Sequence, residues 1–277
     1  KVINSIVKRY HPDIVHMHST KAGLLGRIAL LSYQGRKFYT PHGYSFLRKD
    51  DPKFKIVLYK IVEFLLAHTG CITAACGGGE WKYARQLKKD SVCINNGIDT
   101  AWIDSVLQGT EKKEHEFTVY TAGRIGPQKN PRLFDHIAKQ CPDIRFVWVG
   151  EGEEAGCLTS PNITVTGLVD RESLLQMAVN FDCYLSCALW EGLPVALLEA
   201  MYLQKECIVS SIEGHRDLIE DGQTGLIAYD SDDYIELIDR VRFEHTQYGK
   251  YAHEKVIKEY DMKNMCEGYQ KLYTALE

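Results

Sequence analysis

Short apolar runs alternate with helix-forming segments along most of the chain, and this alternation limits the possible folds more than any other feature. In the first half, the runs 14–18, 37–40, 70–74 and 91–94 have the length and composition of buried strands. A second series of such runs begins at Phe117. Strands that alternate with helices predict parallel sheets covered by helices on both faces, so we expect an α/β protein.

The two series are separated by a polar stretch, residues 109–116, which is typical of a linker. A chain of 277 residues is long enough for two domains. We therefore expect one domain over residues 1–110, a second over 117–245, and C-terminal helices over 246–277. The chain begins within an amphipathic helical pattern and without Met, so we expect the beginning of the first domain to be absent.

The two halves carry opposite charge. Residues 1–110 contain 16 Lys and Arg against 8 Asp and Glu, whereas residues 111–277 contain 17 against 29. A basic domain suits nucleic acid, anionic lipid or an acidic substrate. No nucleic-acid motif accompanies the basic half, so we expect no nucleic-acid partner.

The basic half contains a cluster that suits an anionic membrane surface. Its basic residues lie beside two apolar ones, a mixture typical of a shallow membrane anchor: Arg48, Lys49, Lys53 and Lys55, with Phe46 and Leu47. The alternative is a solvated loop and helix face. No run approaches the ~18 apolar residues of a membrane span. The longest apolar stretch, 56–67, is interrupted by Lys60 and Glu63 and predicts a buried helix.

Cysteine usage favours a reducing compartment. The nine cysteines show neither Cys-x-x-Cys spacing nor paired histidines, so we expect no zinc site. Their odd number and mostly apolar neighbours are typical of buried thiols, and these persist in a reducing cytoplasm. We therefore expect a cytoplasmic protein, and the basic cluster adds the alternative of a peripheral location on the cytoplasmic face of the membrane.

The stretch 181–203 has the pattern of a phosphate site. An apolar strand over 181–186 leads into a turn with Gly192 and Pro194, and good helix formers follow. Free N–H groups and the dipole at a helix N-terminus attract phosphate. Two carboxylates flank this turn: Glu191 lies in the loop, and Glu199 lies just over one turn into the helix.

A second loop has the composition of a diphosphate site. After the strand 117–122, the loop 123–131 contains Arg124, Gly126 and Lys129 before Asn-Pro and a helix. Cations neutralise a diphosphate, and glycines allow its close approach. The loop Gly150-Glu-Gly-Glu153 only weakly matches a dinucleotide motif, and its acidity argues against a nicotinamide cofactor.

Together these motifs resemble the family-4 retaining glycosyltransferases, whose site carries E-x7-E in a setting similar to 190–201. The resemblance implies two Rossmann-like domains facing across a cleft, the GT-B fold, with the last helix, about 262–275, packing back on the first domain. It also implies that Glu199 binds the ribose and Glu191 the donor sugar. The turn Gly192, Leu193 and Pro194 would lie near the phosphates.

The same resemblance assigns further residues. It implies that Arg124 and Lys129 hold the diphosphate beside Gly126, and that the backbone of Gly167, Leu168 and Val169 holds the base. His42 follows the strand 37–40 and stands beside a glycine, where open α/β sheets bind ligands. The resemblance implies that His42 approaches the donor sugar. A turn histidine bonded to backbone is the alternative.

The implied reaction moves a sugar from a nucleotide diphosphate sugar, expected to be a UDP-sugar, to a saccharide or lipid-linked saccharide in surface polysaccharide synthesis. The anomeric configuration is retained, and neither a metal nor another cofactor is expected. No general base is assigned. Two alternatives stay open: a sugar-nucleotide epimerase of similar fold, and a nucleotide-sugar-binding fragment without turnover.

Overall fold

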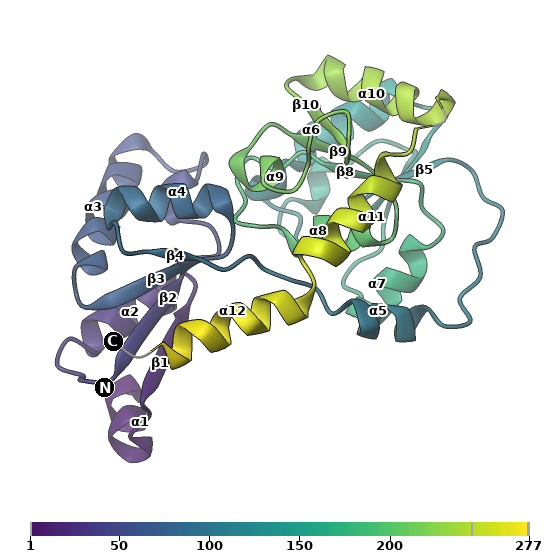
Figure 1. The fold of residues 1–277 in the computed structure, drawn as a ribbon. Helices are drawn as coiled ribbons and strands as arrows, with labels where there is room; N and C mark the ends of the chain where they lie inside the picture. The colour runs from purple at the N-terminus through teal and green to yellow at the C-terminus, as the bar shows by residue number, and fades with distance from the viewer. Residues whose placement is uncertain (1, 245, 276–277) are drawn as a thin grey trace. The chain divides into compact units, whose positions relative to one another are not determined.

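The computed structural model describes residues 2–244 and 246–275, which form two compact units (Figure 1). The first unit contains the chain up to Asn96, the short segment Trp190–Leu193 and the chain from Met265 onward. The second unit contains Gly97–Leu189 and Pro194–Asn264. Both units alternate strands with helices, which confirms the predicted α/β class.

In the described part of the first unit, four parallel strands form a sheet in the order β1-β2-β3-β4. Right-handed crossovers between successive neighbours place the connecting helices α2, α3 and α4 on one face of this sheet. The elements are α1 (Val2–Tyr10), β1 (Ile14–His18), α2 (Thr20–Ala29), β2 (Arg36–Thr40), η1 (Ser45–Leu47), α3 (Lys53–Ala67), β3 (Cys71–Ala75), α4 (Gly78–Leu87) and β4 (Val92–Cys93).

Among the described residues of the second unit, six parallel strands form a sheet in the order β10-β9-β8-β5-β6-β7. Its elements are α5 (Thr100–Leu107), β5 (Thr118–Ala122), η2 (Pro127–Lys129), α6 (Pro131–Gln140), β6 (Arg145–Val149), η3 (Ala155–Cys157), β7 (Ile163–Val165), α7 (Arg171–Ala178), β8 (Cys183–Ser186), α8 (Val195–Tyr202), β9 (Glu206–Ser210), α9 (Glu213–Arg216), β10 (Leu226–Ala228), α10 (Ser231–Phe243) and α11 (Tyr248–Glu259).

Aspartate caps begin several of these helices. The carboxylate of Asp99 accepts from the Trp102 N–H at α5, and Asp170 accepts from the Ser173 N–H at α7. Asp230 accepts from two amides at the start of α10. Each cap satisfies N–H groups that lack a partner within the helix, which fixes where the chain leaves a loop.

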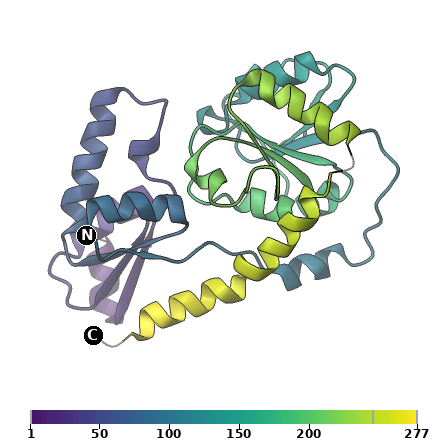
Figure 2. The same cartoon turned by 45° about the horizontal axis from the view of Figure 1, so that its top comes forward.

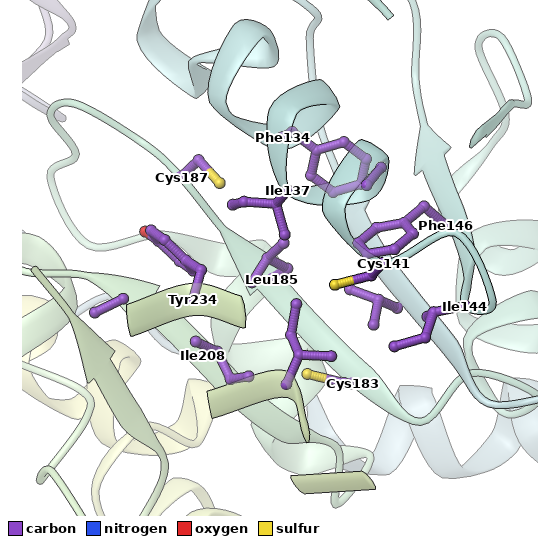
Figure 3. Close-up of a cluster of buried hydrophobic side chains, with 14 of the residues drawn as sticks. Phe134, Ile137, Cys141, Ile144, Phe146, Cys183, Leu185, Cys187, Ile208 and Tyr234 are labelled. Atoms are coloured by element: carbon purple, nitrogen blue, oxygen red, sulfur yellow. The ribbon is translucent and has the colours of Figure 1, made fainter. Parts of the chain in front are cut away.

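The core of the second unit lies between its sheet and the helices α6 and α10 (Figure 3). Phe134 and Ile137 of α6 point toward Leu185 of β8, and Tyr234 of α10 lies beside the same strand. All residues of β5 and β8 are buried. A parallel strand covered on both faces is a mostly apolar run rather than an alternating one, and such runs indicated these strands in the sequence.

The last helix, α12 (Met262–Thr274), contacts the sheet of the first unit (Figures 1 and 2). The Arg36 guanidinium donates to the carbonyls of Leu272 and Tyr273 at 2.7 and 2.6 Å. His16 of β1 contacts the Tyr273 ring edge-on and hydrogen-bonds to its hydroxyl. Hydrogen bonds and a ring contact with β1 and β2 therefore hold the C-terminal end of α12.

Two expectations about the first unit are wrong. Helix α3 forms as predicted, but only Glu63, Leu66 and Ala67 are buried, so it is not a buried helix. Phe46 is buried and stacks on Tyr44 at a centroid distance of 4.6 Å, so it is not a surface anchor. The periodicity of a strongly apolar helix does not specify which side faces the core.

Helix α3 is fixed to α2 by a buried ion pair. The Arg27 guanidinium donates to Glu63 Oε2 at 2.8 Å, and both residues are buried. Arg27 also lies over the Tyr39 ring, 3.9 Å from its centroid, and the Tyr39 hydroxyl donates to Glu63 Oε1 at 3.2 Å. Each charge therefore has a partner away from water, which it requires in a medium of low dielectric.

We expect Glu63→Ala to lower the free energy of unfolding of the first unit by about 3–5 kcal/mol, because it leaves Arg27 buried without its carboxylate. Urea unfolding followed by circular dichroism measures this loss. Lys258→Ala, which removes a solvent-exposed cation, is the control and should change stability by no more than about 0.5 kcal/mol. Equal effects of the two substitutions would contradict the role given to this pair.

Candidate functional site

The second unit has a topological switch point between β5 and β8. From β5 the chain continues through β6 and β7 on one side, whereas β8, β9 and β10 follow on the other side. Open α/β sheets bind ligands at such a point, in the crevice beyond the carboxyl ends of the strands. The loop with Arg124 and Lys129 follows β5, and the loop with Glu191 follows β8.

The loop after β5 brings two cations to one glycine. Arg124 directly follows Gly123, and the Lys129 side chain lies over it: a Cβ built on Gly123 would come within 3.1 Å of Lys129 Cε. Gly123 also has a φ of +134°, which a residue with a side chain rarely adopts. The glycine therefore provides both the turn and the space between the two charged side chains.

The loops after β5 and β6 pack backbone against backbone. The Gly123 N–H donates to the Val149 carbonyl, and the Ile125 N–H donates to the Glu151 carbonyl, each at 2.9 Å. A Cβ on Gly150 would lie 2.2 Å from the Gly123 oxygen, and one on Gly152 would lie 2.1 Å from the Ile125 oxygen. The two glycines of the weak dinucleotide match thus allow this close approach.

These loops border a pocket of about 800 Å³. Its opposite wall comes from the turn after β7 and from α7, and Leu168 exposes 78% of its surface there. The lining residues are Gly123, Arg124, Val149, Gly150, Glu151, Gly152, Glu153, Leu168, Val169 and Leu174. One side of the pocket is glycine-rich and carries Arg124 together with the carboxylates of Glu151 and Glu153, and the other side is apolar. The pocket therefore suits a ligand with a polar end and a flat apolar end.

An acidic side chain holds Arg124 at the pocket. Arg124 Nε donates to Glu153 Oε2 at 3.0 Å, and Arg124 Nη2 lies at the same distance from that oxygen. The Glu153 side chain also lies near Gly126, where a Cβ would come within 3.4 Å of Oε1. Its own backbone amide and the Arg124 charge keep the pKa of Glu153 below its usual value. This pair therefore persists at neutral pH.

Glu199 lies just over one turn into α8 and is paired with a cation from α7. Arg171 Nε donates to Glu199 Oε1 at 2.6 Å, while the guanidinium lies 4.5 Å from the centroid of the Trp102 ring. Burial raises the pKa of Glu199, and the Arg171 charge opposes that increase. Arg171 stands one helical turn before Leu174, which lines the pocket, so α7 connects Glu199 to it.

The segment Trp190–Leu193 groups with the first unit. A Cβ on Gly192 would lie 2.9 Å from the Gly43 nitrogen, so the backbone of Gly192 passes directly against the turn after β2. The Asn96 side chain donates to the Leu193 carbonyl at 3.2 Å. The next residue, Pro194, directly precedes α8. Glu191 therefore belongs to a segment beside His42, the residue before Gly43.

His42 is part of a row of three histidines. A 2.9 Å hydrogen bond joins His42 Nε2 and His18 Nδ1, and His18 stacks on His16 at a centroid distance of 4.2 Å. Desolvation lowers the pKa of all three, to about 4 for His16, and the neighbouring histidines add to the effect at His16 and His42. The row is therefore uncharged at neutral pH, with one ring able to orient the next.

Known proteins match both units. The profile of the family described as "Glycosyl transferases group 1" matches residues 104–255, and that of "Glycosyl transferase 4-like" matches residues 1–75. The first match covers more than half of the chain. The chain therefore belongs to the group 1 glycosyltransferases.

Curated relatives support this assignment. The glycosyltransferase is 30% identical, over 97% of its chain and 76% of the relative, to the Escherichia coli UDP-Gal:alpha-D-GlcNAc-diphosphoundecaprenol alpha-1,3-galactosyltransferase. It is 25% identical to the putative glycosyltransferase EpsD of Bacillus subtilis, over 81% of its chain and 65% of the relative. An enzyme of the glycosyltransferase class is therefore established, in place of the epimerase alternative.

Solved structures identify the fold. The sucrose-phosphate synthase of Thermosynechococcus elongatus matches with a TM-score of 0.84 at 16% identity, over 98% of this chain and 75% of that one. Anabaena HepE in complex with UDP-glucose matches with a TM-score of 0.83 at 17% identity, over 99% and 82% of the two chains. The glycosyltransferase thus has the GT-B fold that the sequence resemblance implied.

Three residues of this glycosyltransferase's site were missed from sequence. Glu153 and Arg171 pair with Arg124 and Glu199 over 29 and 28 positions of sequence, distances that no local pattern covers. Leu174 lines the pocket from α7 but has the spacing of an ordinary helix residue. His215 was not singled out in the sequence; it is buried and bonded to Ser186 and Ser210, which indicates a structural function.

We expect Glu153→Gln to strengthen the binding of inorganic pyrophosphate to the glycosyltransferase. The substitution frees Arg124 and removes a negative charge from the pocket, and an exposed ion pair is cheaply broken. Calorimetric titration with pyrophosphate measures the change. Glu151→Gln is the matched control, because Glu151 lines the same pocket, and it should have a smaller effect. Weaker pyrophosphate binding by Glu153→Gln would contradict this role of Glu153.

Proposed function

We propose that the enzyme transfers a sugar from a UDP-sugar to a lipid-linked saccharide with retention of the anomeric configuration, in the synthesis of a surface polysaccharide. The observation that supports this most is the loop after β5, where Lys129 lies over Gly123 next to Arg124, beside a pocket that α7, the helix of the Arg171–Glu199 pair, also lines. The relative from Escherichia coli names UDP-galactose as donor and a diphosphoundecaprenol-linked sugar as acceptor. UDP-galactose is therefore the first donor to test.

In this proposal, the pocket of the second unit holds the nucleotide. The uracil lies against the backbone of Gly167, Leu168 and Val169; the last two line the pocket, and Gly167 adopts a φ of +73° in the turn before them. The ribose hydroxyls donate to Glu199. Burial raises the pKa of this carboxylate, and the hydrogen bond and charge of Arg171 oppose that increase, which favours the ionised form that accepts hydrogen bonds.

The diphosphate then lies on Gly123 and Gly126, between Arg124 and Lys129. It takes the place of the Glu153 carboxylate, which holds Arg124 when no anion is bound. The amides of Gly192 and Leu193 and the start of α8, after Pro194, add the partial positive charge of a helix N-terminus. These groups stabilise the leaving diphosphate without a metal ion.

His42 and Glu191 are proposed to contact the donor sugar. Both belong to the first unit, where Gly192 packs against Gly43 and so brings their two segments together. The row of uncharged histidines suits hydrogen bonding to sugar hydroxyls, because a neutral imidazole both donates and accepts. Retention is proposed to follow from attack on the same face of the sugar, with the donor phosphate assisting; no side chain is assigned as base.

A cytoplasmic location is part of the proposal. All nine cysteines are free thiols, and six of them are buried. Unpaired thiols in this number are typical of a reducing compartment. None of the helices in residues 2–244 and 246–275 is long and apolar enough to span a bilayer.

Changing Glu199 or Glu191 to glutamine should affect ligand binding in two different ways. Glu199→Gln should weaken binding of both UDP and UDP-galactose by about 1.5–3 kcal/mol, because it removes a charged acceptor of the ribose. Glu191→Gln should leave UDP binding unchanged and reduce UDP-galactose binding or turnover, because Glu191 contacts only the sugar. Calorimetry with both ligands, and UDP release in the presence of a lipid-linked acceptor, separate the two roles.

Glu236→Gln on the exposed side of α10 serves as the control for loss of one carboxylate, and it should bind both ligands as the unchanged protein does. Equal losses of UDP affinity in the Glu191 and Glu199 variants would show that the division of roles is wrong. Unchanged UDP binding by Glu199→Gln would show that Glu199 does not bind the ribose.

A further inference from the structure

Helix α3 exposes a stripe of large apolar side chains. Five of its residues recur at intervals of three and four positions and therefore lie on one side of the helix, and each exposes at least half of its surface: Phe54, Val57, Leu58, Ile61 and Leu65. The opposite side carries Glu63, Leu66 and Ala67, which are buried. With a rise of about 1.5 Å per residue, the stripe is roughly 16 Å long.

The neighbouring helix extends this apolar surface. Helix α2 packs against α3, and the Arg27–Glu63 ion pair fixes the two together. Leu25, Ile28 and Leu31, on α2 and directly after it, expose 62%, 52% and 60% of their surface. Monomeric proteins rarely expose so many large apolar residues on two adjoining helices without a binding function. The α2–α3 face is defined here as Phe54, Val57, Leu58, Ile61 and Leu65 together with Leu25, Ile28 and Leu31.

The charged side chains around the α2–α3 face have one sign. Lys53 and Lys60 lie along one flank of the α3 stripe and Lys55 along the other, and Lys21 is exposed on α2. The two helices contain a single acidic residue, Glu63, and it is buried against Arg27. The nearest acids before α3, Asp50 and Asp51, form ion pairs with Arg48, and Asp51 also pairs with Lys55.

This combination selects the kind of partner. A second copy of the chain on the same face would bring lysines against lysines, and like charges across an interface are unfavourable. An anionic bilayer offers phosphate groups to the lysines and an apolar layer to the stripe between them. Interfacial helices combine an apolar side with flanking basic residues for this reason. The charge pattern thus favours lipid over self-association.

We infer that the α2–α3 face docks this protein on an anionic phospholipid bilayer. The apolar side chains of α3 enter the boundary between headgroups and acyl chains, and Lys53, Lys55 and Lys60 lie at the phosphates. The expected loop anchor is thereby replaced: Phe46 is buried and Arg48 is paired with two aspartates, whereas the exposed stripe lies on the helix that follows them. The inference accords with the proposed lipid-linked acceptor but does not depend on it.

Vesicle sedimentation tests the docking. The full chain should bind vesicles of phosphatidylglycerol mixed with phosphatidylcholine, bind far less to phosphatidylcholine alone, and dissociate as salt is added. A lysine near an anionic surface contributes about a fivefold change in binding, so Lys53→Gln with Lys60→Gln should weaken it roughly thirtyfold. Leu58→Ser with Ile61→Ser should also weaken binding, through the loss of apolar burial.

The matched control is on α11, where Tyr251 and Ile257 are also half exposed and Lys250 and Lys258 lie beside them. Tyr251→Ser with Ile257→Ser, and Lys250→Gln with Lys258→Gln, should leave vesicle binding unchanged. Circular dichroism checks that every variant is folded. If Leu58→Ser with Ile61→Ser does not fold, the Lys53→Gln with Lys60→Gln variant still decides the test.

Three results would overturn the inference: equal binding to neutral vesicles, no binding to either kind, or binding that the α11 control weakens as much as the α3 variants do. Dimerisation in analytical ultracentrifugation that Leu58→Ser with Ile61→Ser abolishes would assign the face to a second copy instead. None of these measurements contains a sugar donor or acceptor. Their outcome is therefore independent of whether the proposed transferase reaction is correct.

Discussion

Burial of β5 and β8 on both faces determines where chemistry can occur in the second unit. Every residue of these two strands is buried, so no side chain along them is accessible to a ligand. Polar groups therefore reach a ligand from the loops at the carboxyl ends of the strands and from the helices that follow them, and the sheet order brings two such loops together at the switch point. The arrangement of Arg124, Lys129 and Glu199 follows from this constraint.

The site balances its charges internally. Glu153 holds Arg124, and Arg171 holds Glu199, so these two groups proposed to bind the nucleotide already have partners of opposite charge. The exposed Arg124 pair is readily opened by a competing anion, whereas Arg171 supports an ionised carboxylate that is itself buried. Binding a diphosphate would therefore exchange one anion for another, and binding a ribose would add donors to an existing acceptor.

The sequence predicted the features that depend on local pattern. Strand positions, the α/β class and the loop with Arg124 and Lys129 follow from apolar runs, glycines and prolines within a few residues of one another. The Glu153 and Arg171 pairs depend on loops that meet only after folding. The burial of α3 was predicted wrongly: a buried helix was expected from its apolar composition, but only Glu63, Leu66 and Ala67 are buried. Composition does not show which side of such a helix faces the core, and the Arg27–Glu63 pair fixes that side here. The site roles assigned by family resemblance stay predictions.

A crystal structure of the chain with UDP tests the central claim most directly. The account predicts the diphosphate within hydrogen-bonding distance of Arg124 and Lys129, the Arg124–Glu153 pair opened, the ribose hydroxyls on Glu199, and the base between Leu168 and the loop after β6. UDP bound elsewhere, or bound in this pocket with Glu153 still paired to Arg124 and no contact with Glu199, would contradict it.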